Sequence, residues 1–280
     1  MNILANPSDN YRRWADGKLE GFTDKMDDLL VEINNPLSIS TAEKSRINQI
    51  IKSKNVVFFD VNKPIPDKKK QIKTYASIFG MGDYELDSKS DTDGLTEIKY
   101  NKKTQQDIEY IPYSDKQLNW HTDGYYDEKP IFSWLLHCEE PAFSGGENYL
   151  LDHELVIREY IIKHGNLDSL SRSDTFIIPG NADAGRDETK GYICDINNKY
   201  KKFHMKFSMR EKNMELNEQS KTAFIRMKKI IKEDCKKYCI TYKLSKNEGI
   251  VSNNILHGRN SFVDGKVMRK LYRIRSYERI

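Results

Sequence analysis

The sequence has no long apolar run and no strong excess of either charge. No stretch approaches the ~20 apolar residues that a membrane-spanning helix needs, and the first residues lack the basic start and apolar run of a secretory signal. The formal net charge is only +4, from 46 Lys and Arg against 42 Asp and Glu, and no basic groove interleaved with aromatic residues is present. We therefore expect a cytoplasmic protein that binds neither a membrane nor nucleic acid.

Cysteine is also scarce. The four cysteines form no CxxC pair, and two of them fall four residues apart in a Lys-rich segment. This spacing is typical of reduced thiols in a cytosol rather than of a disulfide framework. They are Cys138, Cys194, Cys235 and Cys239.

Aromatic residues, by contrast, are plentiful. The 280 residues include 16 Tyr, 11 Phe and 3 Trp, which supply bulky core material although only 38% of residues are hydrophobic and 31% are charged. This composition indicates a folded protein rather than a disordered one. No repeat, low-complexity tract or linker divides the chain, so we predict a single domain over residues 1–280, with a helix-rich part over about 1–95 and a β-rich core over about 96–280.

The first third of the chain is expected to be largely helical. Apolar residues recur at three- and four-residue steps over 11–33, which predicts one surface helix or two short ones. Ser40 and Glu43 have the spacing of a capping box, so a helix is predicted to begin there and to lead into the apolar strand VVFFD. Another amphipathic helix is predicted over 68–79, followed by a polar loop over 87–94.

From Leu95 onward, strand patterns dominate. Short apolar or alternating segments are separated by turn residues, and helices are predicted only over about 153–163 and 217–238. Many short strands with few helices favour an α+β class with a mainly β core, arranged as a barrel or jelly roll with flanking helices. The predicted strands are TEIKY, IEYIPY, IFSWLLHC, NYLLD, TFIIP, KFHMKFS, YKL, GIVSNN and RKLYRIRSY.

A histidine and an aspartate stand two residues apart in the segment LNWHTDGYYDEKP. A two-residue step in an extended segment returns side chains to the same face, so His121 and Asp123 are expected to point the same way. Such a pair is common in turns and carries little weight alone, but His257 lies in a strand near the other end of the chain. A double-sheet roll would bring His257 to the pair. Two imidazoles and one carboxylate on one face suit Fe(II), because the opposite coordination positions stay open.

The chain resembles the Fe(II)/2-oxoglutarate-dependent dioxygenases, in particular the taurine dioxygenase-like (TauD/TfdA) group. The motifs that carry the resemblance are WHTD, GGEN and HGRNSF followed by RKLYR, within residues 119–275. The resemblance implies a double-stranded β-helix (jelly roll) in which His121, Asp123 and His257 bind Fe(II). It also implies that 2-oxoglutarate and O2 are consumed, that succinate and CO2 are released, and that a C–H bond of the substrate is hydroxylated.

The resemblance also suggests how 2-oxoglutarate is held. It places the far carboxylate of this cosubstrate on Arg273, and places Arg269 near the metal-bound end. A guanidinium matches a carboxylate with two parallel hydrogen bonds, which independently favours an arginine in such a site. The family usually has a threonine two residues after the Gly-Gly pair, where this chain has Asn148, whose amide NH2 can donate as a hydroxyl does. Because Asp123 is present where related halogenases carry a small residue, hydroxylation is favoured over halogenation.

Candidate substrate residues flank these motifs. Asp127 could meet a cationic group and Arg210 a carboxylate, so we favour a small polar, amino-acid-like substrate. Each also has a simple structural explanation, as a solvated side chain or as aromatic packing over the cavity. The full set is Arg210, Gln117, Asn119, Tyr125, Tyr126 and Asp127.

Several alternatives stay open at this point. The same metal site would serve an oxidase that desaturates or cyclises its substrate in a natural-product pathway. A non-catalytic barrel that senses a metal or ligand is another alternative, although the complete ligand set together with Arg273 argues against it. A modifier of protein or nucleic acid is a further one, and an oligomer is possible. We interpret three other histidines as packing or capping residues: His137, His153 and His204.

Overall fold

The computed structural model describes residues 9–86, 94–100, 114–180, 187–210 and 214–280. Within these ranges, no helix combines the length and the apolar character needed to cross a bilayer. The predicted strand IEYIPY and, apart from Gly94, the predicted polar loop over 87–94 lie outside the described residues. All four cysteines lie inside them and are free thiols, as predicted.

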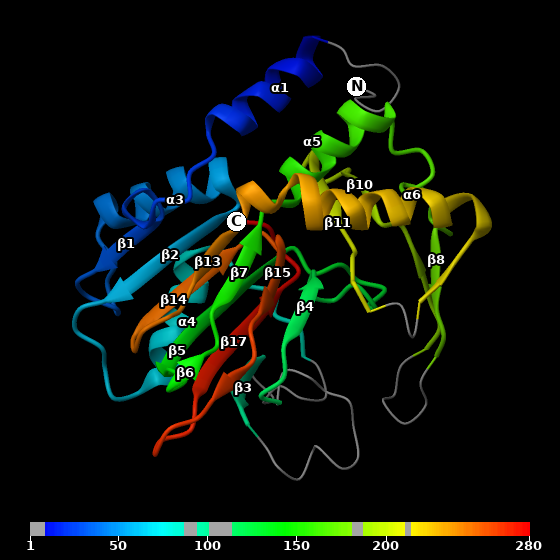
Figure 1. Cartoon of the computed structure of the whole chain (residues 1–280). Helices are drawn as coiled ribbons and strands as arrows, with labels where there is room; N and C mark the ends of the chain where they lie inside the picture. The colour runs from blue at the N-terminus through cyan, green and yellow to red at the C-terminus, as the bar shows by residue number, and fades with distance from the viewer. Residues whose placement is uncertain (1–8, 87–93, 101–113, 181–186, 211–213) are drawn as a thin grey trace.

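Six strands form the larger sheet (Figure 1). Neighbouring strands pair antiparallel, except that the first two run parallel to each other. The strands come from both ends and the middle of the chain, so residues far apart in sequence are brought together. In spatial order they are β1 (Leu30–Ile33), β2 (Val56–Val61), β14 (Glu248–Ser252), β5 (Ser133–Glu140), β17 (Lys270–Ser276) and β3 (Leu95–Lys99).

A second sheet of four antiparallel strands carries most of the predicted site motifs. Smaller pairings complete the β structure: β10 (Cys194–Asn197) with β11 (Lys202–Met205), β16 (Phe262–Val263) with β6 (Ser144–Gly145), and β8 (Phe176–Ile178) between β12 (Glu215–Leu216) and β9 (Thr189–Gly191). The strands of the second sheet, in spatial order, are β13 (Ile240–Tyr242), β7 (Asn148–Leu151), β15 (Leu256–Arg259) and β4 (Leu118–His121).

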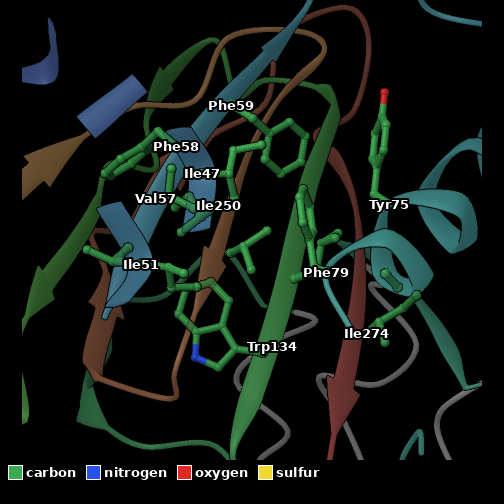
Figure 2. Packing of buried hydrophobic residues seen from close by; sticks show 14 of the residues in the cluster. Ile47, Ile51, Val57, Phe58, Phe59, Tyr75, Phe79, Trp134, Ile250 and Ile274 are labelled. Carbon is green, nitrogen blue, oxygen red and sulfur yellow. The ribbon is translucent and has the colours of Figure 1, made fainter. Parts of the chain in front are cut away.

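The larger sheet is buried on both faces. Successive side chains of a strand point to opposite faces, and in β2 they meet different partners. The ring of Phe59 lies 5.4 Å from that of Tyr75 in helix α4 (Lys68–Ile78), whereas the ring of Phe58 lies 5.3 Å from that of Tyr242 in the second sheet. Figure 2 shows part of this core, including Phe58, Phe59 and Tyr75 together with Trp134 of β5. The core therefore joins the larger sheet to α4 on one side and to the second sheet on the other.

The predicted capping box is confirmed. The backbone N–H of Glu43 donates to Ser40 Oγ at 3.2 Å, and the N–H of Ser40 donates to Glu43 Oε2 at 2.7 Å. Helix α3 (Thr41–Lys54) starts there and ends at Asn55, whose left-handed φ of 61° turns the chain directly into β2. A local sequence signal thus fixes both where this helix begins and how the strand is entered.

The remaining helices gather at one end of the sheets (Figure 1). Except for the short helix over Met26–Leu29, whose Leu29 belongs to the first core, their apolar faces share a second core with residues of the smaller sheets. The last predicted helix changes form partway, because Cys235 N–H bonds to the carbonyl of Ile230, five residues earlier. The segments are α1 (Asp9–Glu20), α2 (Met26–Leu29), α5 (His153–His164), α6 (Glu218–Lys229), a π-helical turn (Ile230–Asp234) and a 3₁₀ turn (Lys236–Tyr238).

Helices and many strands occur together, as the sequence predicted, and several segments differ, among them the end of the first predicted helical segment. Residues Leu30–Ile33 form β1 instead of continuing a helix. Val31 and Ile33 are buried while Glu32 between them is exposed, and the strand pairs with β2. The apolar residues that precede this segment recur at helical spacing and hid its short alternation of buried and exposed residues. Pairing with the buried strand β2 stabilises the extended conformation instead of a helix. The helix-rich N-terminal part therefore also supplies two strands of the larger sheet.

Candidate active site

Strands β4 and β15 bring the two predicted histidines together. They are antiparallel neighbours in which His121 and His257 stand directly opposite each other, and the ring centroids lie 4.3 Å apart. Asp123 follows β4 by two residues, and its Oδ1 lies 3.8 Å from Nε2 of His121 and 3.9 Å from Nε2 of His257. One donor atom from each residue fits within 4.8 Å of the others. The three side chains predicted to converge therefore do so.

Hydrogen bonds fix the orientation of both imidazole rings. His121 Nδ1 lies 2.9 Å from the carbonyl oxygen of Asn119, and His257 Nδ1 lies 2.8 Å from that of Ile255. A carbonyl oxygen only accepts, so each Nδ1 carries the proton and each Nε2 presents its lone pair toward Asp123. Two lone pairs and a carboxylate oxygen then face one another without a proton between them, an arrangement that a cation would stabilise.

The charge states of the three residues suit such a cation. Burial, together with the neighbouring His257, lowers the pKa of His121 to about 3, and burial also lowers the pKa of His257. Burial alone would raise the pKa of Asp123, but the guanidinium groups of Arg273 and Arg275 outweigh it and hold that pKa well below its usual range. Two neutral imidazoles and one carboxylate are the donor set that suits Fe(II) with open positions opposite. The residues present therefore fit the metal that the sequence predicts.

A cavity of about 70 Å³ opens from this cluster between the two sheets. Asn148 and Arg269, which are predicted to contact 2-oxoglutarate, are among the residues that line it, and so is Arg259, for which the sequence suggested no role. Its lining residues are Ile98, Leu118, His121, Asp123, Trp134, Leu136, Asn148, Leu150, His257, Gly258, Arg259, Arg269, Leu271 and Arg273.

Gly258 allows the strands on either side of β15 to approach each other closely beside this cavity. A Cβ atom at this position would lie 2.2 Å from the ring of Tyr149 and 2.5 Å from the carbonyl oxygen of Leu118. The Tyr149 hydroxyl crosses this gap and donates to that same carbonyl, which ties β7 to β4. The glycine in the HGR motif is therefore required by a close approach of neighbouring strands.

The two predicted arginines lie in the reverse of the expected order. Nη1 of Arg273 lies 3.4 Å from each carboxylate oxygen of Asp123, so it is the arginine at the metal end. Arg269 instead lies with its guanidinium 5.0 Å from the ring centroid of Phe262 and close to the Gly-Gly turn that precedes Asn148. Spacing in the sequence identifies the strand but not which of its ends approaches the metal ligands.

Two buried arginines, Arg259 and Arg269, line the far end of the cavity, away from Arg273 and Asp123. Burial disfavours the ionised form of both. Burial, together with the nearby cation Arg259, lowers the pKa of Arg269 to about 9, and burial lowers that of Arg259 to about 10. Arg259 also donates from Nη2 to the carbonyl of Ser114 at 2.9 Å. A bound anion would stabilise both guanidinium groups here.

Comparison with known proteins identifies the family. The profile of the family described as taurine catabolism dioxygenase TauD, TfdA matches residues 20–160, half of the chain. The chain belongs to the TauD/TfdA dioxygenase family. The match includes His121 and Asp123 but ends before His257, which only the fold brings to them. No curated protein matches the sequence.

Solved structures resemble this TauD/TfdA dioxygenase in fold at low sequence identity. A taurine dioxygenase from Burkholderia xenovorans has 12% identity and a TM-score of 0.58, covering 89% of this chain and 86% of its own. An asparagine oxygenase in complex with Fe(II), hydroxyasparagine and succinate has 10% identity and a TM-score of 0.58, covering 94% and 91%. The non-heme iron oxygenase OrfP in complex with (3S)-hydroxy-L-Arg has 12% identity and a TM-score of 0.63, covering 93% and 89%. Together with the donor set, the family identifies the chain as an iron- and 2-oxoglutarate-dependent dioxygenase.

None of the six candidate substrate residues is among the residues that line the dioxygenase cavity. Ser208 forms an isolated antiparallel β-bridge with His121, and the backbone N–H of Met209 donates to the carbonyl of Trp120. The segment that ends in Arg210 therefore runs beside β4. Asn119 and Gln117 on β4 and just before it are exposed. These contacts place the backbone of the segment beside β4, and a role of its side chains in substrate binding stays a prediction.

The other three candidates, Tyr125, Tyr126 and Asp127, are half-buried in the loop after Asp123. The first two pack edge to face, with ring centroids 5.1 Å apart. Arg275 donates from Nη1 to the hydroxyl of Tyr126 at 3.3 Å. The structural explanation of these aromatic residues as packing is thus satisfied, and a role at the substrate entrance stays a prediction.

Two buried residues beside the metal end were not predicted. Arg275 is ion-paired with Glu85, and both side chains are almost completely buried. Arg275 stands two residues after Arg273 in the same strand, so the period-two pattern of β17 could have placed it on the same face. Glu85 belongs to no motif and lies far from every other site residue in sequence, so no local signal marks it.

The remaining buried histidines act as packing residues, as predicted. His204 lies 2.9 Å from the hydroxyl of Tyr192 and 3.1 Å from the carbonyl oxygen of Ile131. His153 contacts the carbonyl oxygen of Phe203 at 3.1 Å, and His137 stacks on Phe59. Hydrogen bonds and packing account for His204 and His153, whereas His137 is held by packing alone, because neither of its buried ring nitrogens has a hydrogen-bond partner among the described residues.

Proposed function

We propose that this dioxygenase hydroxylates an unactivated C–H bond of a small, amino-acid-like molecule while 2-oxoglutarate is converted to succinate and CO2. The observation that carries the proposal is the convergence of His121, Asp123 and His257 at one end of a cavity whose other end holds Arg259 and Arg269. A keto diacid has a chelating end and a carboxylate end, and it matches this distribution of donors and cations.

In the proposed site, His121 and His257 hold Fe(II) through Nε2 and Asp123 holds it through a carboxylate oxygen. Bound iron supplies the activation of O2 that attack on a C–H bond requires. The protein keeps both imidazoles neutral and correctly turned through their backbone hydrogen bonds. Burial of the three side chains, which are at most 15% exposed, limits the access of water.

For 2-oxoglutarate, the observed order of the arginines favours Arg269, with Asn148, as the partner of the far carboxylate. His257 and Arg259 are two residues apart on β15 and therefore point to the same face, about 7 Å apart along the strand. This spacing between His257 and Arg259 is close to the length of a five-carbon diacid, so 2-oxoglutarate would reach from the metal ligands to the arginines at the far end of the cavity. Arg273 then remains beside Asp123, where its positive charge stabilises the negative charge of that ligand carboxylate or of a bound molecule.

The substrate class rests on two kinds of support. The asparagine oxygenase and OrfP, which share the fold, were solved with hydroxylated amino acids. In this chain, cationic and acidic side chains both lie near the metal end: Arg210 follows the segment beside β4, and Asp127 lies in the loop after Asp123. A zwitterion would find groups of both signs there.

The proposed architecture is a single domain built on a double-stranded β-helix. The sheet that contains β17 and the sheet that contains β15 would be its two halves, and the N-terminal part would add β1 and β2 to one of them. All four cysteines are free thiols, which supports a cytoplasmic location.

Succinate release tests the proposed reaction and substrate class together. We would incubate the full chain with Fe(II), 2-oxoglutarate and, in turn, amino acids, sulfonates and betaines, and would measure succinate and product mass. An amino acid that stimulates succinate release and gains one oxygen atom is the expected result. A product that loses two hydrogens instead would show desaturation, and turnover of another class with failure of every zwitterion would contradict the substrate proposal.

A further inference from the structure

Asn254 lies at the junction of the two strands that frame the site. It occupies the turn between β14 and β15, three residues before His257, and is only 2% exposed. Its backbone has a left-handed φ of 50°, a conformation that asparagine and aspartate adopt more readily than most residues. The turn therefore aims this side chain away from β15 and toward the loop that carries Asp123.

The side-chain amide of Asn254 is used entirely on that loop. Its Oδ1 accepts the backbone N–H of Asp123 at 2.9 Å. Its Nδ2 donates to the backbone carbonyl of Asp123 at 2.9 Å and to that of Ile131 at 2.7 Å. One side chain thus holds both polar groups of the Asp123 backbone, and also the end of the loop that begins there.

This clamp matters because Asp123 lies outside a strand. β4 ends at His121, and Thr122 is the last residue held by the neighbouring segment, through Phe207. Beyond that point, the position of the Asp123 backbone relative to His257 depends on a contact between the loop that follows β4 and the turn that joins β14 to β15. Among the contacts of the described residues, Asn254 makes that connection.

We propose that Asn254 is a positioning residue of the metal site, which sets the distance between the Asp123 carboxylate and the two imidazoles without touching the metal. The inference rests on the proposed role of His121, Asp123 and His257 as ligands. Residues that orient metal ligands commonly influence metal affinity although they lie outside the coordination sphere.

The neighbouring Asn253 provides a matched control. It has the same side chain, is also 2% exposed, and also uses its amide on backbone groups. Its Nδ2 donates to the carbonyl of Ile280 at 3.1 Å and its Oδ1 accepts the N–H of Ile280 at 3.0 Å. These bonds hold the C-terminal segment and do not reach the Asp123 loop. The same substitution at the two positions therefore separates general stability from placement of the site.

The variants are Asn254→Asp and Asn253→Asp in the full chain. At position 254 the new carboxylate oxygen would face two carbonyl oxygens, so the clamp is broken with almost no change in shape. Asn254→Gly is the second variant, because glycine keeps the left-handed backbone while removing the amide. Anaerobic Co(II) titration followed by visible absorption gives the metal affinity and the spectrum of the bound ion, and thermal unfolding of the metal-free chain gives stability.

Both Asn254 variants are expected to weaken Co(II) binding by about 10- to 100-fold and to shift the absorption bands of the bound ion. Asn253→Asp is expected to lower the unfolding temperature while leaving the Co(II) affinity within about 3-fold of the parent. Parent-like affinity and spectrum in Asn254→Gly, or equal losses of affinity at the two positions, would overturn the inference. Failure of the parent chain itself to bind Co(II) would instead remove the proposed metal site on which it rests.

Discussion

At the metal end of the cavity, the negative charge of Asp123 lies against Arg273, and Arg275 beyond it is ion-paired with Glu85. At the opposite end, Arg259 and Arg269 are both buried, and the acid nearest Arg269 in sequence, Asp264, accepts from its backbone N–H instead of its guanidinium. Charges are therefore balanced within the chain at one end and incompletely balanced at the other.

This difference indicates what each end needs from a ligand. The metal end is pre-organised: its acid is ionised, its imidazoles are neutral, and a cation enters without any change of protonation. The far end holds two cations whose pKa values are lowered by burial, so it gains most from an incoming carboxylate. Fe(II) and 2-oxoglutarate would thus complete the charge balance at opposite ends of one cavity.

Removing the acid at the metal end should have the largest effect. Asp123→Ala deletes one of three donors and leaves Arg273 without this carboxylate, so we expect activity to fall by more than about 100-fold, beyond the usual effect of residues outside the coordination sphere. Anaerobic addition of Fe(II) and 2-oxoglutarate to the parent should give a weak visible charge-transfer band, and the variant should lack it. A normal band in Asp123→Ala would show that this residue is not a ligand.

Removing a cation at the far end should affect the cosubstrate more than the metal. Arg269→Leu is expected to raise the KM for 2-oxoglutarate by about 10- to 100-fold, the cost of losing a charged hydrogen-bonding partner. Steady-state kinetics with varied 2-oxoglutarate would measure this change, and Co(II) affinity without cosubstrate should stay at the parent value.

Asn148 offers a smaller change at the same end. Asn148→Ala is expected to raise that KM by about 5-fold, as for one neutral hydrogen bond, whereas Asn148→Thr should restore a hydroxyl donor and the parent value. If Arg273→Leu raised the KM for 2-oxoglutarate far more than Arg269→Leu, the order of the two arginines assigned from the structure would be wrong.

The sequence predicted what local patterns and short motifs encode. The period of two placed His121 and Asp123 on one face, and the Ser40–Glu43 spacing predicted where α3 begins. It could not predict contacts between segments that carry no motif. Glu85 meets Arg275 because Glu85 N–H bonds to the carbonyl of Arg275 in β17, and the clamp at Asn254 depends on a left-handed turn. Both depend on how strands meet in three dimensions, which spacing along the chain does not record.

The direction of β17 relative to the metal is a similar case. A pattern of arginines at four-residue spacing is the same whether the strand runs toward the metal ligands or away from them. Register with β5 settles the direction, because Arg275 pairs with Trp134, whose ring lies 4.8 Å from that of His257, whereas Lys270 pairs with Glu140. The chemistry of the arginines was therefore predictable, and their order was not.

The acid beside Arg275 should make the metal end sensitive to pH. Burial raises the pKa of Glu85 to about 8, against the opposing charge of Arg275 and with the help of the neighbouring Asp127 carboxyl group. Burial raises the pKa of Asp127 as well. Because the folded chain then binds a proton more tightly than the unfolded chain, this contribution to stability is complete below the ordinary glutamate pKa and is lost as pH rises toward 8.

Glu85→Gln tests this pH dependence and should produce the smallest of these effects. The amide keeps the shape of a protonated carboxyl group and does not titrate, so the fall in unfolding temperature of the parent between pH 5 and 8 should become shallower, by roughly 2–4 °C for each kcal/mol that the titration of Glu85 contributes. Thermal unfolding of the metal-free chain across this range would measure it, with the exposed Glu218→Gln as the control that leaves the slope unchanged. Equal slopes in the parent and Glu85→Gln would mean that Glu85 is ionised throughout, so that the ion pair with Arg275 persists across this pH range.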